Sequence, residues 1–247
     1  ISRINRTFVS KFFFQTMAAI INIETSTDVC SVALTYNGLV VMQRDDESGH
    51  NHATMLSGFI KDALDQAKFN DIKLEAIAVS IGPGSYTGLR IGLSEAKGLA
   101  YALDLPLIGV STLQLLTADV MFREFYDENV MFAPMIDARR MEVYTAVYDY
   151  ALEALMSPRP LILDNDSYIE YLNRGPVVFF GNGSDKARDV INHPNASFVK
   201  GVKPLASSMM ALADRAFMRS DFLDLAYSTP EYLKEFQATV PKSKLGL

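Results

Sequence analysis

The same order of secondary-structure elements occurs twice in the sequence, and this repeat restricts the possible folds more than any other feature. In each half, three strand-like segments precede an alternation of helical and strand-like segments. The first half predicts strands at 18–24, 30–36, 39–44, 74–81 and 107–110, and helices at 53–68, 89–103 and 112–122. The second half predicts strands at 130–136, 141–149, 161–163, 177–180 and 197–199, and helices at 166–173, 184–191 and 206–219. Such internal repetition indicates duplication of one structural unit.

Three antiparallel strands followed by helix-linked parallel strands are typical of a ribonuclease-H-like unit. Two such units in tandem give the α/β fold of the actin and sugar-kinase (ASKHA) superfamily. We therefore expect an N-terminal domain at 17–122 and a smaller C-terminal domain at 123–247. Residues 1–16 are interpreted as an upstream extension or a cloning remnant, because Met17 opens the first apolar strand.

The composition excludes several classes of protein. A hydrophobic content of 49% with 21% charged residues is typical of a globular chain rather than a disordered one. No apolar run reaches the roughly 18 residues of a membrane span. The net charge of −6 argues against stand-alone nucleic-acid binding. The single cysteine, Cys30, excludes a disulfide framework and favours a reducing, cytoplasmic location.

A glycine-rich segment at 82–92 joins an expected buried strand to a helix. Glycine permits close backbone approach, and the free N–H groups at a helix start can bind an anion. A tight turn with close helix packing explains the same glycines equally well, and the lysine of a P-loop is missing. The residues that could face a phosphate or nucleotide are Gly82, Gly84, Ser85, Thr87 and Gly88.

Acidic residues occupy matching positions in the two halves. Glu24, followed by Thr25 and Ser26, ends the first strand, and Asp137 ends the corresponding strand of the second half. In a duplicated fold the two acids would face each other across a cleft, where they could hold a cation or contact a nucleotide. The alternatives are an ordinary Ser/Thr-rich turn and a surface pair between Asp137 and one of the two arginines after it.

Several segments together resemble the bacterial TsaB family of tRNA threonylcarbamoyladenosine biosynthesis proteins, which are paralogues of the catalytic subunit TsaD. The resemblance extends from Met17 to about Pro241. The segments that carry it are IINIETSTDVCSVAL at 20–34, AVSIGPGSYTGLRIGLSEAKGLA at 78–100, LIGVSTL at 107–113 and PEYLKE at 230–235.

The resemblance implies a subunit without catalytic residues. TsaD is expected to carry a His-x-x-x-His metal pair just after the strand that reads LIGV here, and this chain has Thr112 and Leu116 at those places. A leucine cannot coordinate a metal, and threonine alone is a poor ligand. His50 and His52 are two residues apart, so they do not share a helix face. We therefore expect no metal and no cofactor, beyond weak or shared ATP or ADP binding.

The resemblance also implies partners. TsaD transfers a threonylcarbamoyl group from threonylcarbamoyl-adenylate to the adenosine next to the anticodon, and this chain would pair with TsaD, with TsaE joining the complex. It would form a homodimer when TsaD is absent and would meet tRNA only through the complex. The contact is expected on helices 53–68 and 89–103, through Leu56, Phe59, Ile60, Ala63, Leu89, Gly92, Leu93, Ala96 and Ala100. Packing on the chain's own sheet is the simpler explanation for each of these residues.

Two enzymes that act alone remain as alternatives. One is a small phosphotransferase that uses Glu24, Asp137 and the glycine-rich segment, for which ATP turnover would be the sign. The other is a metalloprotease-like enzyme, for which a tightly bound zinc ion would be the sign.

Overall fold

Two five-stranded sheets form the frame of the computed structural model, which describes residues 18–49 and 51–234. The first sheet has the order β3-β2-β1-β4-β5, and the second β10-β9-β6-β7-β8. The strands are β1 (Ile20–Glu24), β2 (Cys30–Tyr36), β3 (Leu39–Asp46), β4 (Ala76–Gly82), β5 (Leu107–Ser111), β6 (Met131–Asp137), β7 (Glu142–Tyr148), β8 (Ala154–Ile162), β9 (Val177–Phe180) and β10 (Ala196–Phe198).

Both sheets share one topology. The strand that comes first in the chain, β1 or β6, lies in the middle of its sheet, antiparallel to the next strand and parallel to the fourth. This identity confirms the predicted duplication of a ribonuclease-H-like unit and the ASKHA-like α/β class. The predicted extension at 1–16 lies outside the described residues.

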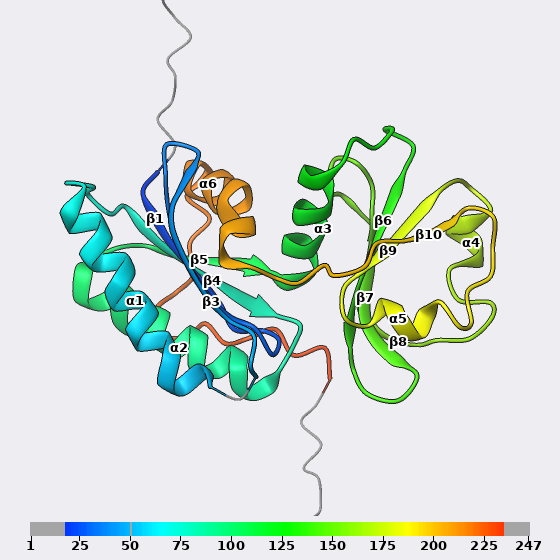
Figure 1. Cartoon of the computed structure of the whole chain (residues 1–247), viewed down its shortest axis with the longest axis horizontal. Helices are drawn as coiled ribbons and strands as arrows, with labels where there is room; N and C mark the ends of the chain where they lie inside the picture. Colours follow the sequence, from blue (N-terminus) through cyan, green and yellow to red (C-terminus); the bar gives the residue numbers. More distant parts are fainter. Residues whose placement is uncertain (1–17, 50, 235–247) are drawn as a thin grey trace, which may run out of the picture.

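The helices cover the sheets in layers (Figure 1). They are α1 (His52–Phe69), α2 (Tyr86–Leu103), α3 (Thr112–Arg123), α4 (Ile169–Leu172), α5 (Ser184–Ala187) and α6 (Met210–Arg219), the last preceded by a 3₁₀ turn at Ala206–Met209. Helices α1 and α2 pack on one face of the first sheet, and α4 and α5 on the outer face of the second. None of the helices within the described residues is long and apolar enough to cross a bilayer.

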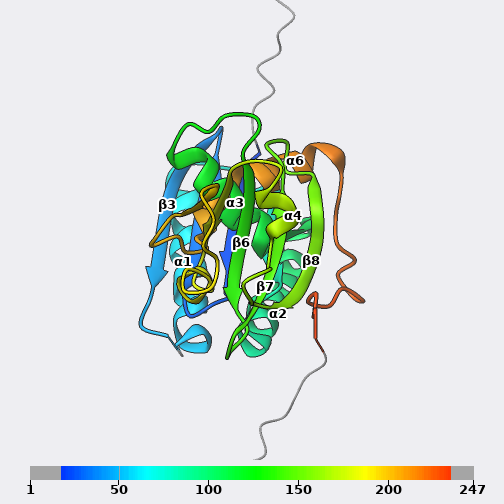
Figure 2. The same cartoon turned by 90° about the vertical axis from the view of Figure 1, so that its right-hand side faces the viewer.

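Helix α3 lies between the two sheets and contributes to the cores of both (Figures 1 and 2). Leu115 and Ala118 pack on the first sheet, whereas Leu116 and Val120 pack on the second. Helix α6, from the second half of the sequence, covers the first sheet. The predicted boundary after residue 122 therefore separates the two sheets, but the helices are shared across it.

Two local predictions were wrong. The strand predicted at 161–163 is the last part of β8, which begins at Ala154. Pro158 and Pro160 hid it, since prolines rarely occur in strands except at an edge, and β8 is the edge strand of its sheet. Ser111 with Gln114 three residues later has the sequence pattern that predicts a capping box at the start of α3, but Ser111 makes no side-chain cap hydrogen bond.

Candidate functional site

The glycine-rich segment packs directly against the turn that follows β1. The backbone N–H of Ser85 donates to the carbonyl oxygen of Ser26 at 2.7 Å, and the Thr25 hydroxyl donates to the carbonyl oxygen of Gly88 at 2.9 Å. Ser85 is also the N-cap of α2, because its Oγ accepts the N–H of Gly88 at 3.2 Å. The structure thus brings together the predicted residues of 24–26 and 82–88.

This packing accounts for the glycines without a ligand. A Cβ on Gly84 would overlap the carbonyl oxygen of Ser26, and a Cβ on Gly88 would overlap that of Thr25. A backbone oxygen cannot move aside without moving the turn, so no side chain fits at either position. Close packing is therefore a sufficient explanation for glycine at these two positions. Binding of a nucleotide at this loop stays a prediction. Thr87 is exposed.

The C-terminal segment closes over the other end of the loop. The N–H of Glu231 donates to the carbonyl oxygen of Ile81 at 2.7 Å, and a Cβ on Gly82 would lie 2.7 Å from the Glu231 carbonyl oxygen. The ring of Tyr232 packs on that of Tyr86 with 4.8 Å between centroids. The end of β4 is thus covered by the chain itself.

Glu24 is fully buried beneath this loop. Its Oε1 accepts the N–H of Ser26 at 2.5 Å, whereas Oε2 is buried with no hydrogen-bond partner in the described part of the chain. Burial raises the pKa of Glu24 from 4.5 to about 7, against the opposing effect of the Ser26 hydroxyl and N–H. A carboxyl group in this position is poised to change its protonation state near neutral pH.

Replacing Glu24 by glutamine is expected to change how stability depends on pH. The folded-state pKa lies above the unfolded one, so wild-type stability from this group is greatest below pH 4.5 and is lost as pH rises to about 7. Glu24→Gln removes that loss while it keeps an acceptor for Ser26. Its free energy of unfolding relative to wild type should rise by on the order of 3 kcal/mol between pH 5 and pH 8, measured by urea denaturation. The matched control is Glu128→Gln at an exposed position; parallel wild-type and Glu24→Gln curves would contradict the prediction.

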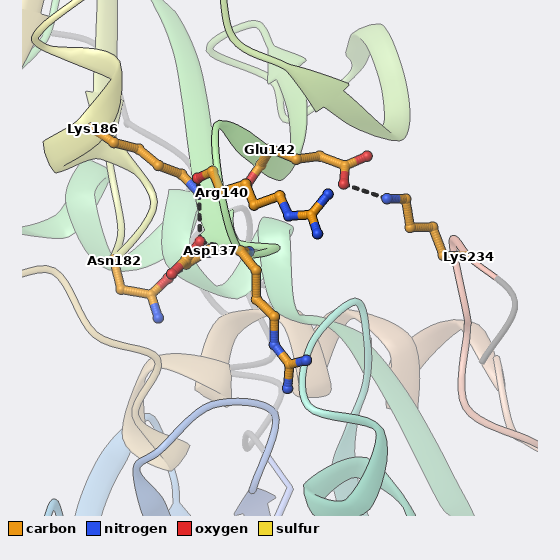
Figure 3. Close-up of polar contacts among 7 residues, drawn as sticks. Asp137, Arg140, Glu142, Asn182, Lys186 and Lys234 are labelled. Atoms are coloured by element: carbon orange, nitrogen blue, oxygen red, sulfur yellow. Dashed lines mark hydrogen bonds and ion pairs between the residues drawn. The ribbon is translucent and has the colours of Figure 1, made fainter. Parts of the chain in front are cut away.

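Asp137 contacts Arg139, Asn182 and Lys186, all in the second half of the chain (Figure 3). It forms an ion pair with Lys186 of α5 at 2.5 Å, and its Oδ1 also accepts the backbone N–H of Arg139 at 2.8 Å. Asn182 accepts the N–H of Asp137 at 2.9 Å. Asp137 does form a surface ion pair, as the alternative interpretation predicted. Its partner is Lys186, however, and not one of the two arginines that follow it in the sequence. A partner 49 positions away leaves no signal in the local sequence.

Most residues predicted to contact a partner are part of the core, which corrects that prediction. The core of the first sheet includes the apolar stripes of α1 and α2, with Leu56, Ile60, Ala63, Leu93, Ala96 and Ala100. The buried residues are Leu56, Ala63, Leu89, Gly92, Leu93, Ala96 and Ala100. Phe59 is half-buried against the same core, and Ile60 is buried but lines a surface groove.

That groove lies between α1 and α2, and we call it the α1–α2 groove. It has a volume of about 650 Å³ and opens to solvent. Its lining is mainly small or apolar, with one cation and one anion: Ala53, Ile60, Arg90, Ile91, Ser94, Glu95, Gly98 and Leu99. A Cβ on Gly98 would meet no atom within 4 Å, and the same holds for Gly58 on α1. These two exposed glycines were not singled out as a pair by the sequence.

The positions that correspond to the TsaD metal ligands lie at the start of α3. Thr112 and Leu116 are both fully buried, and Leu116 belongs to the apolar core of the second sheet. Within 18–49 and 51–234, no three His, Cys, Asp or Glu side chains gather in an arrangement suited to a metal ion.

Comparison with known proteins decides the family. The chain is 32% identical over 177 residues to the TsaB protein of Bacillus subtilis, which covers 70% of this chain and 74% of that protein. It is 30% identical over 226 residues to TsaB of Escherichia coli, with 87% and 94% covered. The chain belongs to the TsaB family. Both relatives are tRNA threonylcarbamoyladenosine biosynthesis proteins, and family membership gives this chain a role in that biosynthesis.

Two further findings agree with the family. The model of the TsaD family, tRNA N6-adenosine threonylcarbamoyltransferase, matches residues 46–242. The solved structure of YeaZ from Pseudomonas aeruginosa superimposes with a TM-score of 0.75 at 28% identity, over 88% of this chain and 100% of that one. The sequence resemblance to TsaB is therefore confirmed by sequence and by fold.

Proposed function

We propose that the chain is a non-catalytic subunit that pairs with TsaD and supports transfer of the threonylcarbamoyl group to tRNA. The observation that carries this proposal is the α1–α2 groove, an open surface with small and apolar residues on a chain whose tRNA-modifying family includes a catalytic paralogue. The burial of Leu116 supports the non-catalytic role, because an apolar core position offers no metal ligand.

The exposed face of the helix pair suits docking of another helix. Glycine inside a helix is unfavourable by about 1 kcal/mol relative to alanine, and neither Gly58 nor Gly98 is required for packing within this chain. Small residues allow a partner backbone to approach closely. Ser57 and Glu95 are joined by a 3.0 Å hydrogen bond that links α1 to α2, so the two helices present one continuous surface. We propose that TsaD occupies this surface, and that a second copy of the chain does so when TsaD is absent.

Reconstitution tests the function directly. Purified TsaD, TsaE, unmodified tRNA and threonylcarbamoyl-adenylate are combined with and without this chain, and modified adenosine is measured by mass spectrometry. We expect modification only when both this chain and TsaD are present. Modification by this chain alone would contradict the non-catalytic role, and full modification by TsaD without it would contradict the supporting role.

The phosphotransferase alternative is tested by ATP turnover of the isolated chain. Glu24 has no exposed surface, so the proposed non-catalytic subunit should show no turnover above that of its Glu24→Gln variant. Turnover that this substitution abolishes would favour the enzyme instead.

A further inference from the structure

Two neighbouring arginines on the turn between β6 and β7 adopt a backbone conformation that arginine rarely has. The φ angle is 69° at Arg139 and 50° at Arg140. In the described part of the chain, no other pair of consecutive non-glycine residues has positive φ. This conformation brings Cβ close to the backbone, so it persists only where the surroundings hold it, which is common at functional sites.

Lys186 holds the turn in place. Its Nζ donates to the carbonyl oxygens of Arg140 at 2.7 Å and of Glu142 at 2.6 Å, and it pairs with Asp137. An ammonium group has three N–H donors, and all three are used here. The same Asp137 oxygen accepts the N–H of Arg139. Lys186 and Asp137 therefore hold the backbone of the turn. The backbone positions of the two arginines do not depend on a bound ligand.

The charge of the two arginines is not balanced locally. The nearby acids are already paired, Asp137 with Lys186 and Glu142 with Lys234 (Figure 3). Arg139 and Arg140 are exposed, and neither forms an ion pair with any described residue. In Figure 3 the guanidinium group of Arg140 extends away from the Asp137–Lys186 pair. The two positive charges are therefore available to bind an anion, although the whole chain has a net charge of −6.

We propose that Arg139 and Arg140 bind phosphate groups of the tRNA backbone while the chain is paired with TsaD, an inference that rests on the proposed function. Guanidinium groups bind phosphate oxygens through paired hydrogen bonds. Both arginines are exposed to solvent on this turn. An open surface suits an extended polyanion, whereas a small nucleotide usually occupies an enclosed pocket.

The test removes both charges while the turn is kept. In the double variant Arg139→Asn/Arg140→Asn, asparagine tolerates positive φ better than arginine does. The matched control is Lys73→Asn/Lys200→Asn, which removes the same charge from exposed sites without ion pairs to described residues. Binding of labelled tRNA to the complex with TsaD is measured by fluorescence anisotropy at several salt concentrations. The arginine variant should bind about 5- to 50-fold more weakly near 0.1 M salt, with a salt slope smaller by about one to two, and the control within about twofold of wild type.

Several outcomes would overturn the proposal. Unchanged affinity in the arginine variant, or an equal loss in both double variants, would reject a specific contact. Loss of ATP binding, measured by calorimetry, with unchanged tRNA affinity would assign the arginines to a small nucleotide instead. Size-exclusion chromatography is run first; a chain that never co-elutes with TsaD contradicts the proposed function, and the same comparison on the isolated chain at low salt then tests the arginines alone.

Discussion

The same glycine-to-alanine substitution is expected to have opposite effects at two positions of α2. Gly88→Ala should destabilise the protein by at least about 3 kcal/mol, because the new methyl group would overlap the carbonyl oxygen of Thr25. Gly98→Ala should stabilise it by up to about 1 kcal/mol, because nothing occupies the space beside Gly98 and alanine favours the helix. Both values can be measured as free energies of unfolding in urea at one pH.

The comparison separates local helix propensity from packing across the molecule. Both positions lie in one helix, so a change in propensity alone would shift stability in the same direction at each. If Gly88→Ala were as stable as wild type, the close contact between the loop after β4 and the turn after β1 would not exist. The explanation of the glycine-rich segment by packing would then be wrong.

The second large effect concerns pairing with TsaD. Gly98→Leu places a bulky side chain on the exposed wall of the α1–α2 groove, where its Cβ meets no atom of this chain within 4 Å. The fold should persist, but a partner helix could no longer approach. We expect the affinity for TsaD to fall by at least tenfold, which corresponds to about 1.4 kcal/mol, measured by calorimetry.

Gly98→Ala is the matched control for pairing, since its side chain is smaller and its position identical. It should lose less affinity than Gly98→Leu. Phe59 is a poorer probe, because its side chain packs partly on the core and its loss would disturb the fold as well as any contact. Wild-type affinity in Gly98→Leu, with folding intact by circular dichroism, would remove this face of α2 from the proposed interface.

The fold could be predicted from the sequence because its periodicity is local. The apolar stripe of α1 and the continuous apolar run of β4 each lie within fewer than twenty residues, so both elements were placed within two residues of their ends. The second half was harder: α4 and α5 are single turns, and β8 contains two prolines at an edge. A helix of four residues spans barely one helical period, so an apolar pattern has no room to repeat.

The candidate site was predicted only in part, because its contacts join distant residues. Glu24, Thr25 and Gly88 were predicted to belong to one site, and the structure places Thr25 against Gly88. The sequence could not show that backbone oxygens fill the space beside the glycines. The stripe of α1 was recognised, but a pattern does not say which apolar residues remain exposed. Lys186 was missed because nothing near it in the chain indicates the turn that it holds.

The exchange of helices between the halves ties the two sheets into one cooperative unit. A polypeptide cut after residue 122 would leave the first sheet without α6 and the second without α3, so each fragment would expose an apolar face. Amide protons of β1 and β6 should accordingly become accessible to solvent deuterium in the same global opening event rather than in two separate ones. A chain built in this way would keep its two sheets fixed relative to each other.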